Sequence, residues 1–192
     1  MMRIGIFGGS FNPIHVGHLV LAETAREALM LDRVVFIPTR NPPHKRASDL
    51  LPGAVRFELV RLAIRDNPAF VASDVELQRD GPSYSVDTVK ILRSQLPQAK
   101  LFLLIGEDML AVKWFAWKEI KQLCTVVMAH RLGPKARRSE PGVKRLDMPL
   151  LDISSTQIRS RLKAGRSIRY LVPPSVERYL QHHQLYQRGS AA

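Results

Sequence analysis

Short apolar runs alternate with amphipathic segments along most of the chain. A short apolar run that ends at glycine or proline predicts a strand buried on both faces. Apolar residues spaced three and four apart predict a helix with one buried stripe, which a following proline ends. The predicted strands are Arg3–Phe7, Arg33–Ile37, Phe70–Val75, Leu101–Ile105 and Cys124–Ala129, and the predicted helices are Gly17–Leu31, Ala54–Asp66 and Val86–Leu96.

This alternation of strand and helix predicts an α/β fold. We expect a Rossmann-like, doubly wound parallel sheet with helices on both faces and further helices at the C-terminus. We assign residues 1–188 to a single domain and expect 189–192 to be a disordered tail. Ligands of such folds bind beyond the carboxyl ends of the strands. Three predicted strand ends carry residues suited to binding, namely Gly8-Gly9, Pro38–Lys45 and Gly106–Asp108.

The segment Leu132–Met148 interrupts this pattern. It contains Gly133, Pro134, Pro141 and Gly142 together with five Lys and Arg residues. We expect a flexible basic loop here rather than a dedicated binding patch.

The chain carries an excess of positive charge, which favours anionic binding partners. The 192 residues include 29 Lys and Arg against 17 Asp and Glu, which gives a net charge of +12. Such a field favours nucleotides, nucleic acid or an anionic membrane, although solvated surface charge is the alternative interpretation. No apolar run approaches the roughly 18 residues that span a bilayer, and the N-terminus lacks the features of a secretory signal. We therefore expect no membrane association.

The single cysteine, Cys124, excludes an internal disulfide and agrees with a reducing cytoplasm, where we expect the protein. It lies in an apolar stretch with no activating group beside it. We interpret it as core packing rather than as a nucleophile.

The first group of chemically suggestive residues runs from Gly8 to His18, with the sequence Gly-Gly-Ser-Phe-Asn-Pro-Ile-His-Val-Gly-His. Two glycines after a buried strand allow the backbone to approach a ligand closely, and the start of the following helix is a natural anion site. His15 and His18 are three residues apart, so near a helix start they face the same way and can donate hydrogen bonds to phosphate. Gly17 between them leaves room for a ribose or a base.

Two other interpretations of His15 and His18 stay open. The pair could bind zinc, although no third ligand lies nearby and there is no His-Glu-x-x-His pattern. They could also be structural histidines with satisfied hydrogen bonds. The segment is not a Walker A loop, because Gly-Lys followed by Ser or Thr is missing.

The second group is Ile153–Arg159, Ile-Ser-Ser-Thr-Gln-Ile-Arg. Ser154 and Gln157 form the pattern of a capping box, and Ile153 and Ile158 that of a hydrophobic staple, so a helix start is predicted without any function. Free N–H groups, three hydroxyls and the helix dipole also make an anion site. Arg159 can add a guanidinium fork for phosphate.

Together, and in this order, the two groups resemble the signatures of the His-x-Gly-His nucleotidyltransferase superfamily, whose second motif is Ser-Ser-Thr-x-Ile-Arg. Within it, the chain from residue 3 to about 186 is similar to bacterial nicotinate mononucleotide adenylyltransferases. The segments that carry this likeness are Gly8–Pro13, Pro42–Lys45, Gly81–Ser85, Ile105–Asp108 and Trp114.

Three positions depart from the usual pattern of that family. Asn12 stands where Asp is more common, Ser83-Tyr84-Ser85 where Ser-Tyr-Thr is usual, and Arg131-Leu132-Gly133 where Arg-Pro-Gly is common. Asn12 removes a negative charge near the phosphates, so we assign it no metal or base role.

The resemblance implies transfer of AMP from ATP to nicotinate mononucleotide, which gives nicotinate adenine dinucleotide (deamido-NAD) and pyrophosphate in NAD biosynthesis. The attacking phosphate is already ionised at neutral pH, so catalysis would consist of positioning and charge neutralisation. Mg²⁺ is expected to arrive with ATP, held by phosphate oxygens and water rather than by protein ligands. The sequence leaves open whether the protein forms a homo-oligomer.

The resemblance also implies the roles of individual residues. The catalytic group would be His15, His18, Lys45 and Arg159. ATP would be held by Phe7, Gly8, Gly9, Ser10, His18, Ile105, Gly106, Asp108, Arg131, Ser154, Ser155, Thr156 and Arg159. Nicotinate mononucleotide would contact Ser10, Phe11, Lys45, Tyr84, Ser85 and Trp114, with the Trp114 indole stacked on the pyridine ring and with Tyr84 and Ser85 at its carboxylate.

Some residues have a second interpretation that does not involve the substrate. Asp108 could instead begin a helix, and Trp114 could belong to the core. His44 is interpreted as structural, and His130 is left without a role. The remaining pair, His182 and His183, has the pattern of solvated helix-end residues.

Rival functions differ in the residues they need. Transferases of the same superfamily that act on nicotinamide mononucleotide, phosphopantetheine or a phosphoalcohol are close rivals, but the latter two usually lack Pro42–Lys45 and Gly81–Tyr84. A remnant of an aminoacyl-tRNA synthetase would need a Lys-Met-Ser-Lys-Ser-like loop, which is missing. A basic RNA-binding module would need exposed aromatics among basic residues, whereas most aromatics here lie in apolar segments, so nucleic acid is not expected as a partner.

Overall fold

The computed structural model describes residues 1–42, 50–107, 109, 112–131 and 140–187, apart from the side chain of Arg131. Within these ranges six strands form one wholly parallel sheet in the order β3-β2-β1-β4-β5-β6. The strands are β1 (Arg3–Gly9), β2 (Arg33–Pro38), β3 (Phe70–Ala72), β4 (Lys100–Gly106), β5 (Thr125–Arg131) and β6 (Val143–Met148).

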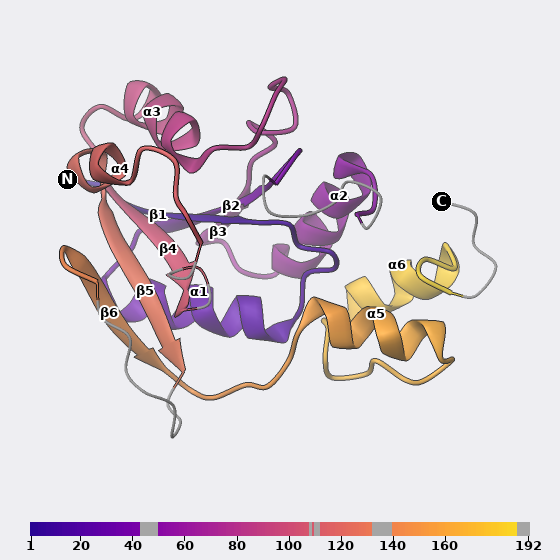
Figure 1. The fold of residues 1–192 in the computed structure, drawn as a ribbon. Coiled ribbons are helices and arrows are strands. Elements are labelled where there is room, and N and C mark those ends of the chain that lie inside the picture. The colour runs from indigo at the N-terminus through magenta and orange to yellow at the C-terminus, as the bar shows by residue number, and fades with distance from the viewer. Residues whose placement is uncertain (43–49, 108, 110–111, 132–139, 188–192) are drawn as a thin grey trace.

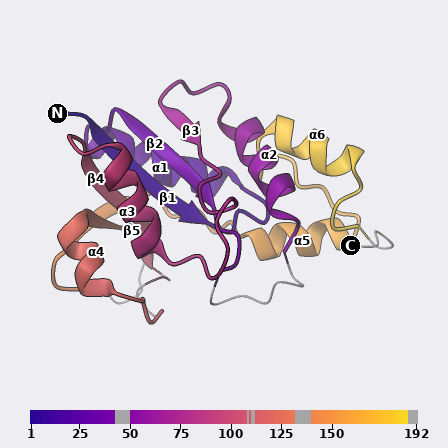
Figure 2. The ribbon, with the colours of Figure 1, turned by 90° about the horizontal axis from the view of Figure 1, so that it is seen from above.

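Helices cover both faces of the sheet, as Figure 1 shows. One core cluster joins the sheet to α1 (Val16–Ala28), α2 (Gly53–Ile64), α5 (Ser155–Lys163) and α6 (Pro174–His182). A second cluster, on the opposite face, joins it to α3 (Ser85–Gln95) and α4 (Trp117–Leu123). Figures 1 and 2 agree that α2, α5 and α6 lie together, on the side toward which the chain leaves β1. The predicted doubly wound α/β fold with C-terminal helices is therefore confirmed.

The alternation of side chains along β1 explains the two cores. Ile4 and Ile6 point into the cluster that contains α3 and α4, whereas Phe7 belongs to the cluster that contains α1. Gly5 lies on the α1 side, where a Cβ atom would come within 2.8 Å of the Leu31 side chain. A glycine is therefore needed for the chain after α1 to pack this closely on β1.

The strand order reverses between β1 and β4, which makes a topological switch point. The chain goes from β1 outward to β2 and β3, then returns to β4 on the other side of β1. The pairing of β1 with β4 ends at Ile6 and Leu103, although the two strands continue to Gly9 and Gly106. Their carboxyl ends thus separate beyond the last pair, which is where open α/β sheets bind ligands.

Each predicted strand and helix is present, with ends shifted by a few residues. The prediction of a loop over Leu132–Met148 was wrong at its C-terminal end, because Val143–Met148 forms the edge strand β6. Only Leu146 and Met148 of this strand are buried, while Lys144 and Asp147 are exposed. An edge strand buries one face only, so its charged residues concealed the strand pattern. Residues 132–139 of the predicted loop and the predicted tail 189–192 lie outside the described residues.

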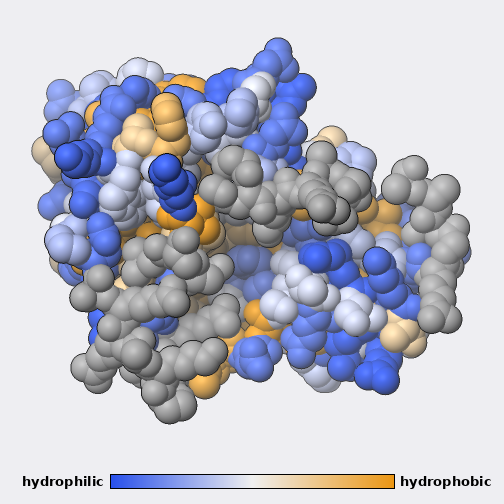
Figure 3. All heavy atoms as spheres, in the orientation of Figure 1, coloured by the Kyte–Doolittle hydropathy of each residue, from blue (hydrophilic) through white to orange (hydrophobic). Residues whose placement is uncertain are grey.

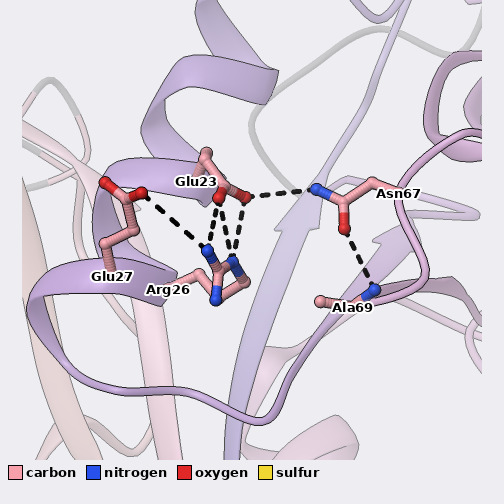
Figure 4. Close-up of polar contacts among 5 residues, drawn as sticks. All are labelled: Glu23, Arg26, Glu27, Asn67 and Ala69. Atoms are coloured by element: carbon pink, nitrogen blue, oxygen red, sulfur yellow. Dashed lines mark hydrogen bonds and ion pairs between the residues drawn. The ribbon is translucent and has the colours of Figure 1, made fainter.

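The start of β3 is tied to α1 by a small polar network, drawn in Figure 4. Arg26 Nη2 donates to Glu23 Oε1 at 2.6 Å, and the Asn67 side-chain amide donates to Glu23 Oε2 at 3.2 Å. Asn67 Oδ1 in turn accepts the backbone N–H of Ala69 at 3.0 Å. The hydrogen bonds from Arg26 hold the pKa of the Glu23 carboxyl below its usual value. This network anchors one edge of the sheet far from the switch point.

Candidate functional site

The loop that joins β1 to α1 contains a sharp turn. Gly9 has no side chain, and a Cβ atom there would come within 3.0 Å of the Phe11 ring. Phe11 can therefore fold back into the core with a positive φ of 43°, where its ring is 1% exposed and meets the Phe7 ring edge to face. Asn12, also buried, precedes Pro13 through a cis peptide bond. The predicted contact of Phe11 with the mononucleotide is thus left to its backbone.

His15 and His18 lie together at the N-terminus of α1. Their rings stack with centroids 3.7 Å apart, and the backbone N–H of His15 donates to His18 Nδ1 at 3.1 Å. Because Nδ1 accepts this hydrogen bond, a neutral His18 ring carries its proton on Nε2. The ring centroids of Phe7 and Phe11 lie 6.0 and 5.1 Å from that of His18, tilted in the first pair and edge to face in the second, so both phenylalanines pack against this imidazole. The two imidazoles thus lie side by side, and their contact with phosphate stays a prediction.

The second signature forms the start of α5, as its capping pattern predicted. Ser154 is the N-cap residue, and its hydroxyl accepts the backbone N–H of Gln157 at 3.1 Å. Ile158 is fully buried beneath this turn, and Ile153 packs against the same cluster. The helix start is therefore stabilised by its own sequence, independently of any ligand.

The two signatures meet in space. Ser155 Oγ donates to the backbone oxygen of Pro13 at 2.9 Å. Arg159 Nη1 donates to the backbone oxygen of Asn12 at 2.8 Å, and its Nη2 to Thr156 Oγ1 at 3.2 Å. The loop after β1 and the first turn of α5 thus form one surface, which combines two helix N-termini, two imidazoles and a guanidinium group. Such a collection of donors suits a polyphosphate.

Two residues that were not identified from the sequence hold this loop in place through hydrogen bonds. Arg56 on α2 is 1% exposed and donates to the backbone oxygens of Ser10 and Leu51, both at 2.8 Å. Tyr186, after α6, donates its hydroxyl to Asn12 Oδ1. A signal for Arg56 was present, because it lies four and eight residues before Val60 and Ile64 on the buried stripe of its helix. No local pattern points to Tyr186.

On the β4 side of the switch point, an ion pair or hydrogen bond links the ends of β4 and β5. His130, buried on β5, has Nδ1 at 2.9 Å from Oε2 of Glu107, which directly follows β4. These residues precede Arg131 and Asp108 in the sequence. His130, which had been left without a role, thereby links the ends of β4 and β5, which carry the predicted ATP-binding residues Gly106 and Arg131.

The predicted mononucleotide residues lie at the start of α3 and before α4. Ser85 is the first residue of α3 and Tyr84 its N-cap. The Tyr84 ring lies 4.6 Å, between centroids, from Phe115, which is 59% exposed. Trp114 donates from Nε1 to the backbone oxygen of Met109 at 2.8 Å, and its ring tilts against Trp117 at 5.1 Å. The sequence had not indicated Phe115.

Comparisons with known proteins agree with this geometry. Residues 6–161 match the family model described as cytidylyltransferase-like. The chain is 44% identical over 188 residues to the "Probable nicotinate-nucleotide adenylyltransferase" of Thermus thermophilus, covering 97% of this chain and 100% of the relative. It is 43% identical over 212 residues to the protein of the same name from Citrifermentans bemidjiense, covering 96% and 98% of the two chains. The chain belongs to the nicotinate-nucleotide adenylyltransferase family.

Solved structures of proteins with this family's name share the fold. Nicotinic acid mononucleotide adenylyltransferase of Plasmodium falciparum, solved as a complex with NaAD, superimposes with a TM-score of 0.79 at 18% identity, covering 97% of this chain and 98% of that one. A putative nicotinate-nucleotide adenylyltransferase from Vibrio parahaemolyticus gives a TM-score of 0.74 at 24% identity, covering 97% and 96%. At these identities the likeness concerns the fold.

Most of the predicted site of this adenylyltransferase family member gathers at the carboxyl end of the sheet. Two residues of the predicted site, Lys45 and Asp108, lie outside the described residues, as does the side chain of Arg131. His44, which was interpreted as structural, is also outside them. Among the residues that the structure describes, no group of three or more His, Cys, Asp and Glu could hold a metal ion. Cys124 is buried, as predicted, and burial raises the pKa of its thiol to about 11.

Positive charge gathers at the C-terminal end of α5. Figure 3 shows hydrophilic residues over α5 and α6. Lys163 at the end of α5, and Arg166 and Arg169 between the two helices, are exposed. Their field favours the approach of an anionic ligand to Arg159. None of the described helices is long and apolar enough to cross a bilayer. His182 and His183 are exposed at the end of α6, as the sequence predicted.

Proposed function

We propose that the protein transfers AMP from ATP to nicotinate mononucleotide, with release of pyrophosphate. The observation that carries this proposal is the contact of the two signatures, in which Ser155 and Arg159 bind the backbone of Pro13 and Asn12. This contact brings the paired imidazoles close to the N-termini of α1 and α5, which supports a single phosphate-binding site beside the switch point. The names of the relatives, which share 43% to 44% identity over nearly the whole chain, supply the substrate.

The reaction needs no covalent intermediate on the protein. An oxygen of the 5′-phosphate of the mononucleotide forms a bond to the α-phosphorus of ATP, and the bond from that phosphorus to the bridging oxygen of pyrophosphate breaks. The attacking oxygen is already ionised at neutral pH, so a general base is unnecessary. Catalysis then consists of holding the two phosphates in line and stabilising the charge that spreads over the equatorial and leaving oxygens.

The arrangement of donors supports specific roles. His18, whose Nδ1 is occupied by the His15 backbone, offers Nε2–H to a phosphate oxygen. Arg159 is held in place by Asn12 and Thr156, so its planar group is oriented before ATP binds. Donors that are already ordered stabilise a transition state without a further cost in reorganisation.

Mg²⁺ would enter with ATP as part of the substrate. The described donors at the loop are imidazole, guanidinium, hydroxyl and amide groups, which suit phosphate oxygens better than a hard cation. The ion would therefore be held by phosphate oxygens and water, and it would neutralise charge on the triphosphate.

The nicotinate carboxylate would be recognised at the N-terminus of α3. The first N–H groups of a helix lie outside its hydrogen-bond ladder and favour a negative group. Ser85, the first residue of this helix, adds a hydroxyl. The Phe115 ring lies against that of Tyr84, and Trp114 precedes Phe115 in the sequence, so aromatic faces are offered beside this helix end. A neutral carboxamide would gain less from this helix end, which supports nicotinate over nicotinamide. A cytoplasmic location agrees with the use of ATP and with a single buried thiol.

A pyrophosphate-release assay tests this function. Purified protein would be given ATP and Mg²⁺ with nicotinate mononucleotide, nicotinamide mononucleotide or phosphopantetheine in separate reactions, and the dinucleotide product would be identified by mass. We expect rapid turnover with the nicotinate compound and much slower turnover with the other two. Preferred turnover of phosphopantetheine, or no pyrophosphate with any acceptor, would contradict the proposal.

A further inference from the structure

Side-chain hydrogen bonds hold the carbonyl oxygens of the turn after β1. Those of Ser10, Asn12 and Pro13 accept hydrogen bonds from side chains of α2 and α5. A carbonyl oxygen directed at a triphosphate would repel it, whereas a carbonyl that accepts a hydrogen bond from a guanidinium or hydroxyl group is held in one orientation. The orientation of this turn is thus determined by side chains of α2 and α5.

Arg56 is the most deeply buried of these groups. Its guanidinium Nε donates to Leu51 and its Nη1 to Ser10, so one planar group joins the segment before α2 to the turn after β1. Arg56 and Ser10 are 46 positions apart in the sequence. The guanidinium is removed from water, and this burial lowers the pKa of Arg56. A buried arginine needs such acceptors to offset its desolvation.

Tyr186 secures the next residue of the turn. Its hydroxyl donates to Asn12 Oδ1, which also accepts the backbone N–H of Leu51 at 3.1 Å. Burial raises the pKa of Tyr186, although the nearby Arg159 and Arg56 oppose the shift, so the hydroxyl stays protonated and donates at neutral pH. The chain after α6, at the far end of the sequence, thereby reaches the first signature.

We propose that Arg56 and Tyr186 are positioning residues for adenylyl transfer, which hold the turn Ser10–Pro13 so that the following His15 and His18 meet the triphosphate in a fixed orientation. This inference rests on the proposed function. It assigns a role in the reaction to α2 and to the C-terminal segment, neither of which carries a signature. Both residues act through the turn and neither is placed on the substrate.

The substitution Tyr186→Phe removes one hydroxyl and keeps the ring. Because a neutral hydrogen bond to a buried acceptor is lost and the Leu51 N–H remains, we expect the protein to fold and kcat to fall about fivefold. The KM for ATP should change less than twofold, because the phosphate donors are still present but less well aligned. Tyr170→Phe is the matched control, since Tyr170 is 85% exposed, and it should keep wild-type kcat.

Arg56 is tested by Arg56→Met and Arg56→Lys. Methionine fills the space but donates nothing, so kcat should fall about a hundredfold, whereas lysine can donate to one of the two carbonyls and should restore part of it. Both kcat and the thermal midpoint would be measured, with assays well below the midpoint. If Arg56→Met does not fold, Tyr186→Phe decides the question.

The two proposals fail in different ways. Wild-type protein that releases no pyrophosphate from ATP with nicotinate mononucleotide overturns the proposed function. Wild-type protein that turns over, together with Tyr186→Phe and Arg56→Lys that lose thermal stability but keep wild-type kcat, overturns the positioning role. A lower kcat in both variants with an unchanged KM for ATP supports it.

Discussion

Arg159 on α5 donates a hydrogen bond from Nη1 to the backbone oxygen of Asn12, at 2.8 Å and across 147 positions of the sequence. This contact turns two separate helix starts into one site. It also means that the guanidinium group is ordered by the protein itself, because Thr156 accepts its second donor. The chemical consequences of this contact can be measured.

The substitution Arg159→Lys should lower kcat strongly while the protein remains folded. A lysine keeps the charge but cannot donate at once to Asn12 and to a phosphate with a planar fork. We expect a loss of about 2 kcal/mol of transition-state stabilisation, or roughly thirtyfold in kcat/KM. Arg178→Lys on α6 is an exposed control in pyrophosphate release. Equal activity of Arg159→Lys and wild type would exclude a direct role for this fork.

His18→Ala should remove one preorganised donor to the reacting phosphate. The expected loss is about 2–4 kcal/mol, or roughly 30- to 1,000-fold in kcat, which is the size found when one such donor is deleted. Single-turnover measurements with saturating ATP would separate this effect from binding. His183→Ala, at the exposed end of α6, should leave kcat unchanged. Full activity of His18→Ala would overturn the assigned role.

Gly17→Ala should separate stability from activity. Alanine favours the helix, so the free energy of unfolding should stay equal or rise by up to about 1 kcal/mol. Its Cβ atom would nevertheless lie 3.1 Å from His15 Nδ1, so the imidazole has to shift by a few tenths of an ångström. We expect kcat to fall about tenfold, since small displacements of positioned groups are costly. Urea unfolding and pyrophosphate release would be compared on the same preparation, and an active Gly17→Ala would show that the site tolerates this shift.

Trp114→Ala should weaken the binding of nicotinate mononucleotide more than the binding of ATP. Loss of an aromatic face on which a ring stacks costs about 1–3 kcal/mol, so the KM for nicotinate mononucleotide should rise at least fivefold. The KM for ATP is the internal control and should change little. An equal rise in both KM values would indicate that Trp114 supports the fold, through its contacts with Met109 and Trp117, rather than the nicotinate ring.

Glu76 should make the protein less stable as the pH rises. Burial raises the pKa of its carboxyl above the ordinary value of 4.5, and the hydrogen bond from Thr88 opposes this only in part. The unfolded chain therefore releases its proton at lower pH than the folded chain does, so this contribution to stability is complete below about pH 4.5 and is lost as the pH rises through the folded pKa. Glu76→Gln should be more stable than wild type at pH 7, and the difference should shrink toward pH 4.

Glu23 is the control for Glu76, because its pKa is shifted in the opposite direction. Its pKa is lowered by the hydrogen bonds from Arg26, so its contribution is present above its ordinary pKa of 4.5 and is lost as the pH falls. Glu23→Gln should thus be slightly less stable than wild type at pH 7, by a small amount because the group is partly exposed. Thermal midpoints between pH 4 and 8 would test both signs. A parallel pH dependence of the two variants would contradict this account.

The sequence by itself determined the class of fold, the helix starts and the chemistry. The run Arg3–Phe7 and its successors predict parallel strands because residues buried on both faces must be apolar, which is a local property. The cap at Ser154 was predictable for the same reason, since its hydroxyl bonds to Gln157 only three residues away. The resemblance of the two signatures to a known superfamily then indicated a nucleotidyl transfer.

Tertiary structure alone decided which distant groups complete the site. Arg56 and Tyr186 contact the turn after β1 from 46 and 174 positions away. The buried stripe of α2 includes Arg56 but does not indicate which carbonyl it binds, and no local pattern points to Tyr186. The edge strand β6 was hidden for a related reason, because only one of its faces meets the core. Local patterns report the burial and caps of nearby residues, whereas the pairing of a buried donor with a remote carbonyl depends on how the elements pack.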